Sequence, residues 1–215
     1  MIVLAIDTAG TGCQAALYDL DQDRILGAAG ADIGRGHAER LMEFVDAAFD
    51  AAGLTLKDIG RIAVTIGPGS FTGIRVGVAA ARGLALALGV PAVGVSTLSA
   101  LAADHRATSS LLVAMDAKRD EVYWQRFAAD GSAMSPPAIA SLETARTLAA
   151  GHDGMIAGSG AALLRDGAPQ GSDSVAIATV ARLGACLDPG NDPPKPLYLR
   201  GPDAKPQAGF AIKRA

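Results

Sequence analysis

The chain has 215 residues, half of them hydrophobic and 19% charged, with a formal net charge of −3. This length suffices for one large domain or two small lobes around a buried core. The charge argues against a protein that binds nucleic acid unaided, because such proteins usually present a basic face. No run approaches the roughly 20 apolar residues of a membrane-spanning helix.

The amino-terminal stretch MIVLAID lacks the basic start of a signal peptide, so we expect a cytoplasmic protein without membrane contact. The mean hydropathy is positive, which predicts that part of the apolar surface meets a partner. Cys13 and Cys186 lie far apart without metal-ligand spacing. We expect both to be free, buried thiols.

The first half of the chain has a strand-rich start followed by alternating helices and strands. The segments MIVLAI, GCQAALYDL and RILGAAGADI are strand-like. The helix from His37 to Ala52 ends at Gly53, and RIAVTI is a buried strand. A helix from Ile74 to Leu88, the strand PAVGV and the helix STLSALAAD, capped by Ser96, complete the order β-β-β-α-β-α-β-α.

The second half begins in the same way. LLVAMD and EVYWQRF are strands, and a turn at Asp130-Gly131 leads toward a third. Helices led by Ser141 and Ser174 follow, with the strand GMIAG between them. The Pro- and Gly-rich tail from about residue 189 is expected to be irregular.

A repeat connects the two halves. Asp7 and Asp116, Tyr18 and Phe127, and Asp21 and Asp130 share one offset of 109 residues. This pattern predicts an α/β protein with duplicated βββαβα units, the two-lobed ASKHA fold of actin, hexokinase and Hsp70. The expected lobes are residues 1–106 and 107–215.

Several motifs together resemble a known family, TsaB. They are LAIDTAGTGCQAALYD, GHAERLM, IGPGSFTGIRVGVAAARGLALALGVPAVGVSTLSALA, MDAKRDEVYWQRF and PLYLRGPDA, and they follow the same order over nearly the whole chain. The resemblance implies the two-lobed fold and a non-catalytic subunit of bacterial tRNA threonylcarbamoyladenosine synthesis.

The resemblance also implies partners. A TsaB subunit pairs through a helical bundle with its catalytic paralogue TsaD, which modifies the adenosine beside the anticodon, and the ATPase TsaE joins the complex. Alone, the chain is expected to pair with a second copy, and tRNA is reached only through the complex. No cofactor is expected on the isolated chain, although ATP or ADP at the interface with a partner stays open.

A nucleotide site within the chain would use one hairpin from each half. Candidates in the first hairpin are Asp7, Thr8, Gly10, Thr11 and Gly12, whose glycines permit close approach and whose hydroxyls can donate. The equivalent positions of the second hairpin hold Arg119, Asp120 and Glu121. Two carboxylates facing a polyphosphate repel it, although Lys118 and Arg119 offset part of this repulsion. A small-molecule kinase or ATPase remains the alternative.

Metal-dependent hydrolysis has weaker support. Thr97 and Leu101 stand where the catalytic paralogue carries its His-x-x-x-His metal ligands. His37, His105 and His152 are scattered, and we interpret them as surface or capping residues. GPGSFTG also departs from the Gly-x-Ser-x-Gly nucleophile elbow. A glycoprotease-like peptidase is therefore a second alternative, and no catalytic or metal-binding residue is assigned.

The stretch GPGSFTG resembles a phosphate-binding loop but lacks the lysine of the P-loop, because Ile74 follows Gly73. Gly67 and Gly69 permit an abrupt exit from the preceding strand, and Ser70 or Thr72 can cap the next helix. We interpret the stretch as a turn that aims this helix. Anion binding at the helix start remains open.

Two helices carry more apolar surface than their own lobe requires. In the first, Glu39, Glu43, Asp46 and Asp50 form a narrow acidic stripe and apolar residues cover most of the rest. In the second, Arg75 and Arg82 are the only charges. The predicted partner interface comprises Leu41, Met42, Val45, Phe49, Ile74, Arg75, Val78, Ala81 and Arg82.

Two further hypotheses concern this interface and the end of the chain. If the interface is correct, Val45→Glu or Val78→Glu should disrupt assembly; the alternative is a central helix enclosed by its own lobe. The small basic end, Arg200, Lys205, Lys213 and Arg214, is a candidate tRNA contact, although solvated charge is the simpler interpretation.

Overall fold

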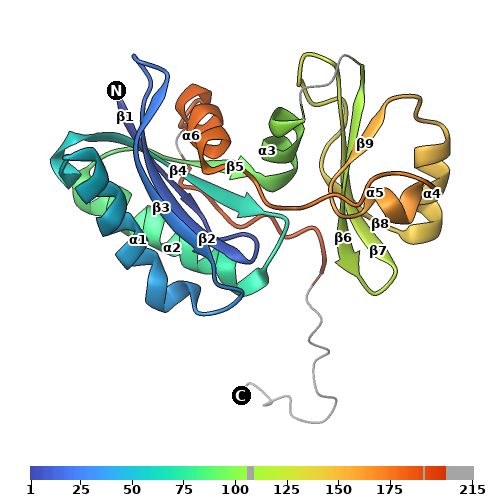
Figure 1. Cartoon of the computed structure of the whole chain (residues 1–215), viewed down its shortest axis with the longest axis horizontal. Coiled ribbons are helices and arrows are strands. Elements are labelled where there is room, and N and C mark those ends of the chain that lie inside the picture. Colours follow the sequence, from blue (N-terminus) through green and yellow to red (C-terminus); the bar gives the residue numbers. More distant parts are fainter. Residues whose placement is uncertain (106–108, 191, 202–215) are drawn as a thin grey trace, which may run out of the picture.

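The computed structural model describes residues 1–105, 109–190 and 192–201, which form two lobes, each built on one sheet (Figure 1). The first sheet has the order β3-β2-β1-β4-β5. β1 pairs antiparallel with β2 and parallel with β4. The elements of this lobe are β1 (Ile2–Asp7), β2 (Gly12–Asp19), β3 (Arg24–Asp32), α1 (His37–Ala52), η1 (Leu56–Asp58), β4 (Ile59–Gly67), α2 (Phe71–Leu88), β5 (Ala92–Ser96) and α3 (Thr97–Asp104).

The second sheet has the order β8-β7-β6-β9 and repeats the pairing of the first. β6 pairs antiparallel with β7 and parallel with β9. The elements that follow α3 are β6 (Leu111–Lys118), β7 (Glu121–Phe127), β8 (Ala138–Ser141), α4 (Leu142–Ala150), β9 (Met155–Ala157), α5 (Ala161–Leu164) and α6 (Ile177–Cys186).

The repeat seen in the sequence is confirmed by these strands. Equivalent strands begin 109 residues apart: β1 at Ile2 and β6 at Leu111, and β2 at Gly12 and β7 at Glu121. Tyr18 and Phe127 occupy equivalent places and are both buried in the core that the lobes share. The two-lobed α/β fold with a duplicated strand pattern is therefore confirmed.

α3 and α6 lie between the two sheets (Figure 1). α6 comes from the second half of the sequence but packs on β1, β2, β4 and β5 of the first lobe. A side chain at Gly184 would bring its Cβ within 2.2 Å of the Ala63 Cβ, so glycine permits this close approach. The predicted division at 106/107 stays a prediction: β1–β5 precede it and β6–β9 follow it, and α6, from the second half, packs on the first sheet.

Polar anchors hold α6 at both ends. Arg61 Nη1 donates to the carbonyl oxygens of Gly184, Ala185 and Leu187 at distances of 3.0, 2.7 and 2.8 Å. A cation there stabilises the carboxyl end of the helix dipole. At the other end, the Asp104 carboxylate accepts from the Ala176 amide at 3.0 Å. The helix begins at Ile177 with Ala176 as its N-cap, so the predicted start at Ser174 is wrong.

α1 and α2 cover the opposite face of the first sheet (Figure 1). α1 ends at Gly53, as predicted, and Gly53 adopts the left-handed conformation. α2 begins at Phe71, three residues before the predicted start, and Ser70 is its N-cap. The mean hydropathy of α2 is 1.4, so by length and composition the helix could cross a membrane, contrary to the sequence expectation. Core helices pass the same test, and α2 packs on β4.

Candidate functional site

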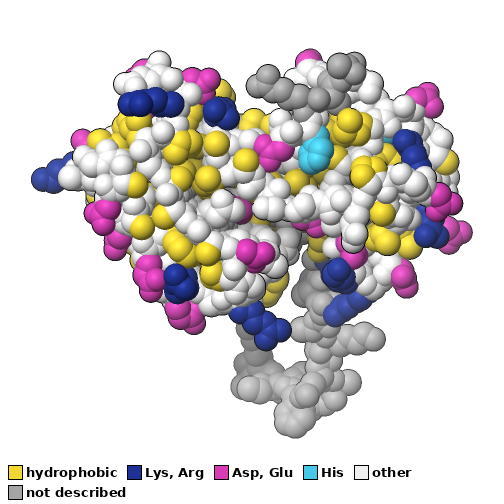
Figure 2. All heavy atoms as spheres, viewed as in Figure 1, with side chains coloured by type: hydrophobic (Ala, Val, Ile, Leu, Met, Phe, Trp, Pro, Cys, Tyr) yellow, Lys and Arg dark blue, Asp and Glu magenta, His cyan; other side chains and the backbone are white. Residues whose placement is uncertain are grey.

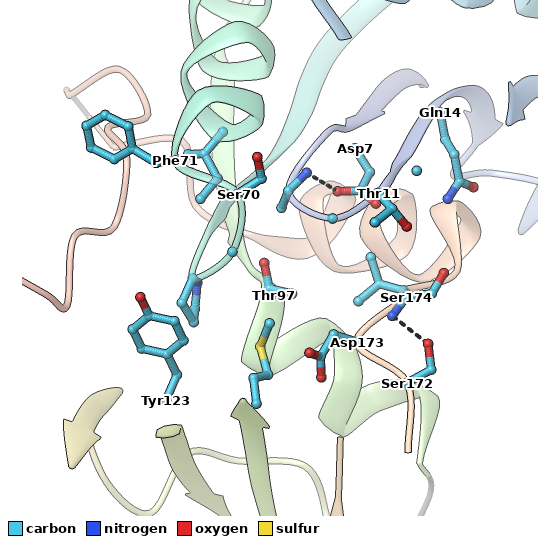
Figure 3. Close-up of a pocket in the computed structure, with 18 of the residues that line it drawn as sticks. Asp7, Thr11, Gln14, Ser70, Phe71, Thr97, Tyr123, Ser172, Asp173 and Ser174 are labelled. Carbon is cyan, nitrogen blue, oxygen red and sulfur yellow. Dashed lines mark hydrogen bonds between the residues drawn. The ribbon is translucent and has the colours of Figure 1, made fainter. Parts of the chain in front are cut away.

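A cleft of about 1780 Å³ lies between the lobes, and the two predicted hairpins line its opposite sides. The first hairpin contributes Gly10, Thr11 and Gly12, and the β6 end of the second contributes Asp116 and Lys118. Thr11, Gln14, Thr97 and Tyr123 come from different elements and surround the same space (Figure 3).

Two of the five nucleotide candidates are engaged inside the first lobe. Asp7 is buried, and its Oδ1 accepts from the Ala9 amide at 3.0 Å and from Thr65 Oγ1 at 2.7 Å. Burial raises the pKa of the Asp7 carboxyl, although both hydrogen bonds oppose this shift. Thr8 Oγ1 donates to the carbonyl oxygen of Gly73 at 2.8 Å and is fully buried. The expectation that Thr8 donates to a phosphate is therefore wrong, whereas Asp7, Gly10, Thr11 and Gly12 line the cleft.

The GPGSFTG loop packs directly on this hairpin. A Cβ added at Gly69 would lie 2.2 Å from the carbonyl oxygen of Ala9, and one at Gly73 would lie 2.0 Å from that of Thr8. The Ser70 amide donates to the same Ala9 oxygen at 2.6 Å. Ser70 Oγ in turn accepts from the Gly73 amide at 3.2 Å and caps α2. The glycines therefore let the start of α2 pack directly against the β1–β2 turn. This confirms that the loop is a turn that sets the direction of α2.

The second hairpin is closed by charged pairs. Lys118 Nζ donates to Asp116 Oδ2 at 2.6 Å, which lowers the pKa of the Asp116 carboxyl and raises that of the Lys118 ammonium. Arg119 and Asp120 form the turn with φ angles of 58° and 57°. Glu121 forms an ion pair with Arg200, which offsets a further part of the repulsion predicted from Asp120 and Glu121.

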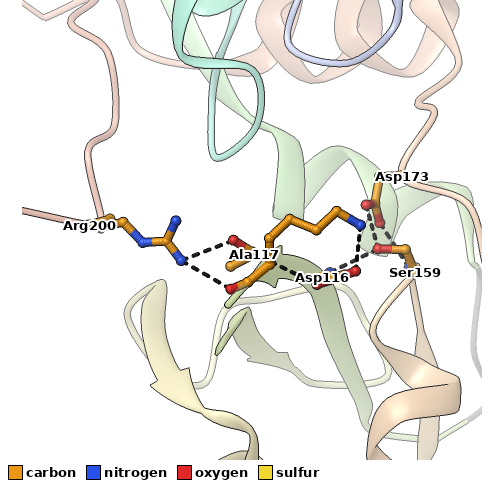
Figure 4. Close-up of polar contacts among 6 residues, drawn as sticks. Asp116, Ala117, Ser159, Asp173 and Arg200 are labelled. Carbon is orange, nitrogen blue, oxygen red and sulfur yellow. Dashed lines mark hydrogen bonds and ion pairs between the residues drawn. The ribbon is translucent and has the colours of Figure 1, made fainter. Parts of the chain in front are cut away.

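Another carboxylate, Asp173, lies beside this hairpin. Ser159 Oγ donates to Asp173 Oδ2 at 2.5 Å and accepts from the Asp116 amide at 2.8 Å (Figure 4). Burial raises the pKa of the Asp173 carboxyl. Sequence reasoning missed Asp173, which lines the cleft, and Ser159, which connects it to Asp116, because both are brought there only by the folding of residues 158–175 beside β6. Asp116 and Asp173 line this side of the cleft together with Lys118 and Arg200, so carboxylates and cations are balanced there.

Of the residues at the paralogue's metal positions, Leu101 belongs to the core and Thr97 lines the cleft. Thr97 and Leu101 are both buried in α3, and Thr97 Oγ1 has no hydrogen-bond partner within the described part of the chain. His37, His105 and His152 each donate from a ring nitrogen to a backbone carbonyl oxygen. Across the described residues, no three His, Cys, Asp or Glu side chains gather as a metal site.

The cysteines differ from the sequence expectation at one position. Both are free, and Cys13 is buried as predicted, whereas Cys186 is exposed. Burial raises the pKa of the Cys13 thiol to about 11. Since a thiol with this pKa stays protonated at neutral pH, Cys13 is a packing residue.

Six of the nine predicted interface residues face inward. Leu41, Val45, Phe49, Ile74, Val78 and Ala81 are buried in the core beneath α1 and α2, with Val45 only 1% and Val78 only 3% exposed. They cannot meet a partner without unfolding the lobe. Val45→Glu and Val78→Glu would therefore act on folding, so the predicted residue set is corrected; Met42, Arg75 and Arg82 are the three that are exposed.

The exposed side of α2 forms a continuous row at helical spacing, which we call the α2 stripe. Its two ends are apolar: Phe71 is 57% and Leu86 is 87% exposed. Arg75 lies over the Phe71 ring, 3.7 Å from its centroid. The signal was present in the sequence, because Arg75 and Arg82 mark the solvent side and residues on their line share it. The α2 stripe consists of Phe71, Arg75, Ala79, Arg82 and Leu86.

The basic chain end is only partly described. Arg200 contacts the second hairpin, whereas Lys205, Lys213 and Arg214 lie outside the described residues. On the face seen in Figure 2, Lys and Arg side chains are interspersed with Asp and Glu around the outline and form no single basic patch.

Comparisons with known proteins identify the family. A model described as TsaD, tRNA N6-adenosine threonylcarbamoyltransferase, matches residues 25–175. An uncharacterized protein of Mycobacterium tuberculosis is 38% identical over 215 residues, covering 96% of this chain and 95% of that protein. The Escherichia coli tRNA threonylcarbamoyladenosine biosynthesis protein TsaB is 38% identical over 133 residues, 60% of this chain and 56% of that protein.

A solved structure agrees with these sequence matches. It is a Pseudomonas aeruginosa protein described as similar to peptidase YeaZ, with a TM-score of 0.75 and 30% identity over 93% of this chain and 99% of that one. The fold, the duplicated strand order and these relatives agree. The chain belongs to the TsaD family and, within it, is a protein of the TsaB (YeaZ) type.

Proposed function

We propose that this chain is a non-catalytic, activating subunit for the formation of threonylcarbamoyladenosine in tRNA. Its partner is a catalytic protein of the TsaD type, with a TsaE-type ATPase in the complex, and the chain acts in the cytoplasm. The name of the E. coli relative supports the pathway. The first hairpin supports a role in assembly rather than catalysis, because Asp7 Oδ1 and Thr8 Oγ1 form their hydrogen bonds within the first lobe.

The α2 stripe is the observation that carries this proposal. Leu86 is almost fully exposed although it lies on a helix whose other side fills the core. Exposed apolar residues at helical spacing favour docking against another helix. Ala79 and Gly83, also exposed, permit close approach of that helix. We propose that the stripe docks on the partner, and on a second copy when the chain is alone.

Substitution of Leu86 tests this docking without disturbing the core. Leu86→Glu adds a charge to the stripe and should weaken association by about 2 kcal/mol or more, because the charge would be buried at the interface. Met134→Glu is the matched control, since Met134 is 62% exposed and lies on the second lobe. Size-exclusion chromatography with light scattering, alone and with the TsaD-type partner, measures the association. Equal association of both variants would contradict the proposal.

The alternative activities predict a different result. A small-molecule kinase would turn over ATP without a partner, and a peptidase would cleave peptide bonds. We propose instead that any nucleotide needed for assembly lies at the interface with the catalytic partner. ATP binding and hydrolysis by the isolated chain, with the complex as comparison, separate a kinase from an interface nucleotide, and a peptide-cleavage assay tests the peptidase.

A further inference from the structure

Residues 195–201, which we call the strap, run from the first lobe to the second along the interlobe cleft. Leu197 through Gly201 line the cleft, and the strap passes beside the start of α2 before it reaches the β6–β7 hairpin. In Figure 1 the strap is the red stretch that leads into the grey carboxyl-terminal trace, at the gap between the two lobes. None of the activities proposed above uses these residues.

The strap is anchored on the first lobe by its backbone and one aromatic ring. The Leu197 amide donates to the carbonyl oxygen of Ile66 in β4 at 2.8 Å. Tyr198 OH accepts from Arg75 Nε at 2.7 Å, and the Tyr198 ring lies 5.5 Å from the Phe71 ring. The Arg75 guanidinium faces both rings, so this anchor combines a hydrogen bond with cation–π contacts.

The strap is anchored on the second lobe by one side chain. Arg200 Nη2 donates to the carbonyl oxygens of Ala117 and Lys118 at 2.9 and 3.3 Å (Figure 4). It also forms an ion pair with Glu121. The Arg200 side chain is three-quarters shielded from solvent. Shielding and several acceptors make this contact stronger than an ordinary surface ion pair.

The anchors are too close in sequence to allow much separation. From Leu197 to Arg200 the chain advances three residues, which span at most roughly 10 Å when fully extended. With both anchors in place, the β6–β7 hairpin cannot move far from β4. We propose that the strap is a releasable latch that sets the opening of the interlobe cleft, and that Arg200 is its releasing end.

Release of Arg200 should change the distance between the lobes. Spin labels at Asp46→Cys on α1 and Glu143→Cys on α4, with Cys186→Ser, report this distance by pulsed electron resonance. Arg200→Ala should lengthen and broaden the distance distribution. Hydrogen exchange at residues 117–122 should accelerate by about tenfold or more, since a charge-assisted contact no longer opposes local opening.

Two comparisons keep the test decisive. Arg146→Ala removes a similar contact within the second lobe, to the Leu163 carbonyl, and should leave the distance unchanged. Insertion of Gly-Gly-Ser after Leu199 keeps both anchors but lengthens the strap by roughly 10 Å, so it should also broaden the distribution. If Arg200→Ala and the insertion both remain folded by circular dichroism and both retain the wild-type distribution, the latch is overturned.

Discussion

The second sheet repeats the order of the first four strands of the first sheet, but the two hairpins place equivalent aspartates in opposite environments. Asp7 is buried with neutral donors, and burial raises its pKa. Asp116 lies 109 residues later, pairs with Lys118, and has a lowered pKa. The first hairpin is thus stabilised by neutral hydrogen bonds within its own lobe, while the second is stabilised by ion pairs at the cleft. A duplicated backbone has kept its topology while the chemistry of its turns has diverged.

The outer layers differ as well. α1 and α2 span 16 and 18 residues, whereas α4 and α5 span 9 and 4. Only the first lobe therefore has long helices, within the described chain, whose outer sides can pair with other helices. This difference locates the proposed docking surface on the first lobe and leaves the second lobe to complete the cleft.

The largest expected effect comes from breaking the contact between the first hairpin and the α2 loop. Gly73→Ala would place a methyl group against the Thr8 carbonyl oxygen, and we expect a loss of about 3 kcal/mol in unfolding free energy. Urea denaturation measures it. Gly83→Ala is the control: Gly83 lies on the same helix with nothing within 4 Å of the added Cβ, so stability should hold or rise. Equal effects would refute this close contact.

A smaller effect is expected where α6 is held on the first lobe. Arg61→Ala removes three contacts to the carboxyl end of α6 and should cost about 2 kcal/mol. Arg40→Ala removes an exposed pair with Glu43 and should cost less than about 1 kcal/mol. Thermal denaturation of both variants makes the comparison, and a similar loss in both would mean that Arg61 does not anchor the helix.

Helix caps provide a matched pair across the lobes. Ser70 accepts from the Gly73 amide and Ser141 from the Thr144 amide, both at 3.2 Å. Ser70→Ala and Ser141→Ala should each cost about 1 kcal/mol in urea denaturation. A much larger loss for Ser70→Ala than for Ser141→Ala would contradict a capping contribution of similar size at the two helices.

The pH dependence of stability should differ in sign between the two aspartates, and this is the subtlest effect. Because the pKa of Asp7 in the folded protein lies above its usual 3.8, the contribution of Asp7 to stability is lost as pH rises from 3.8 through the folded pKa. The folded pKa of Asp116 lies below 3.8, so its contribution is lost as pH falls from 3.8 through that pKa.

Asparagine variants separate these two contributions. Asp7→Asn should remove the decline above pH 3.8, and Asp116→Asn should remove the decline below it. Urea titrations across this range measure both. Parallel changes in the two variants would contradict the opposite environments of the two hairpins.

The fold could be predicted in outline because apolar alternation and the 109-residue repeat are local signals. The packing of α6 on the other lobe's sheet could not, since no local pattern says which sheet an apolar helix will cover. Sequence reasoning also assigns the inner side of α2 to the partner interface, although it is core. Residues on both sides of the helix are apolar, so hydrophobicity alone cannot separate core from contact surface. Arg75 and Arg82 mark the outer side, and this positional signal is stronger than the count of apolar residues.

The candidate site was predictable only where backbone freedom decided the outcome. Gly10 and Gly12 remain open to the cleft, as their small size suggested. Thr8 donates a hydrogen bond to Gly73, which lies 65 residues away, and Glu121 forms an ion pair with Arg200, 79 residues away. Such long-range partners leave no trace in the local pattern, so the free groups of a cleft cannot be listed from sequence alone.

Reconstitution of tRNA modification tests the central claim most directly. The TsaD-type partner, the ATPase and tRNA are combined with wild-type chain, Leu86→Glu, Met134→Glu or no chain, and threonylcarbamoyladenosine is measured in a nucleoside digest. We expect full modification with wild type and Met134→Glu, and loss with Leu86→Glu or without the chain. Undiminished modification in the absence of this chain would contradict its role as an activating subunit.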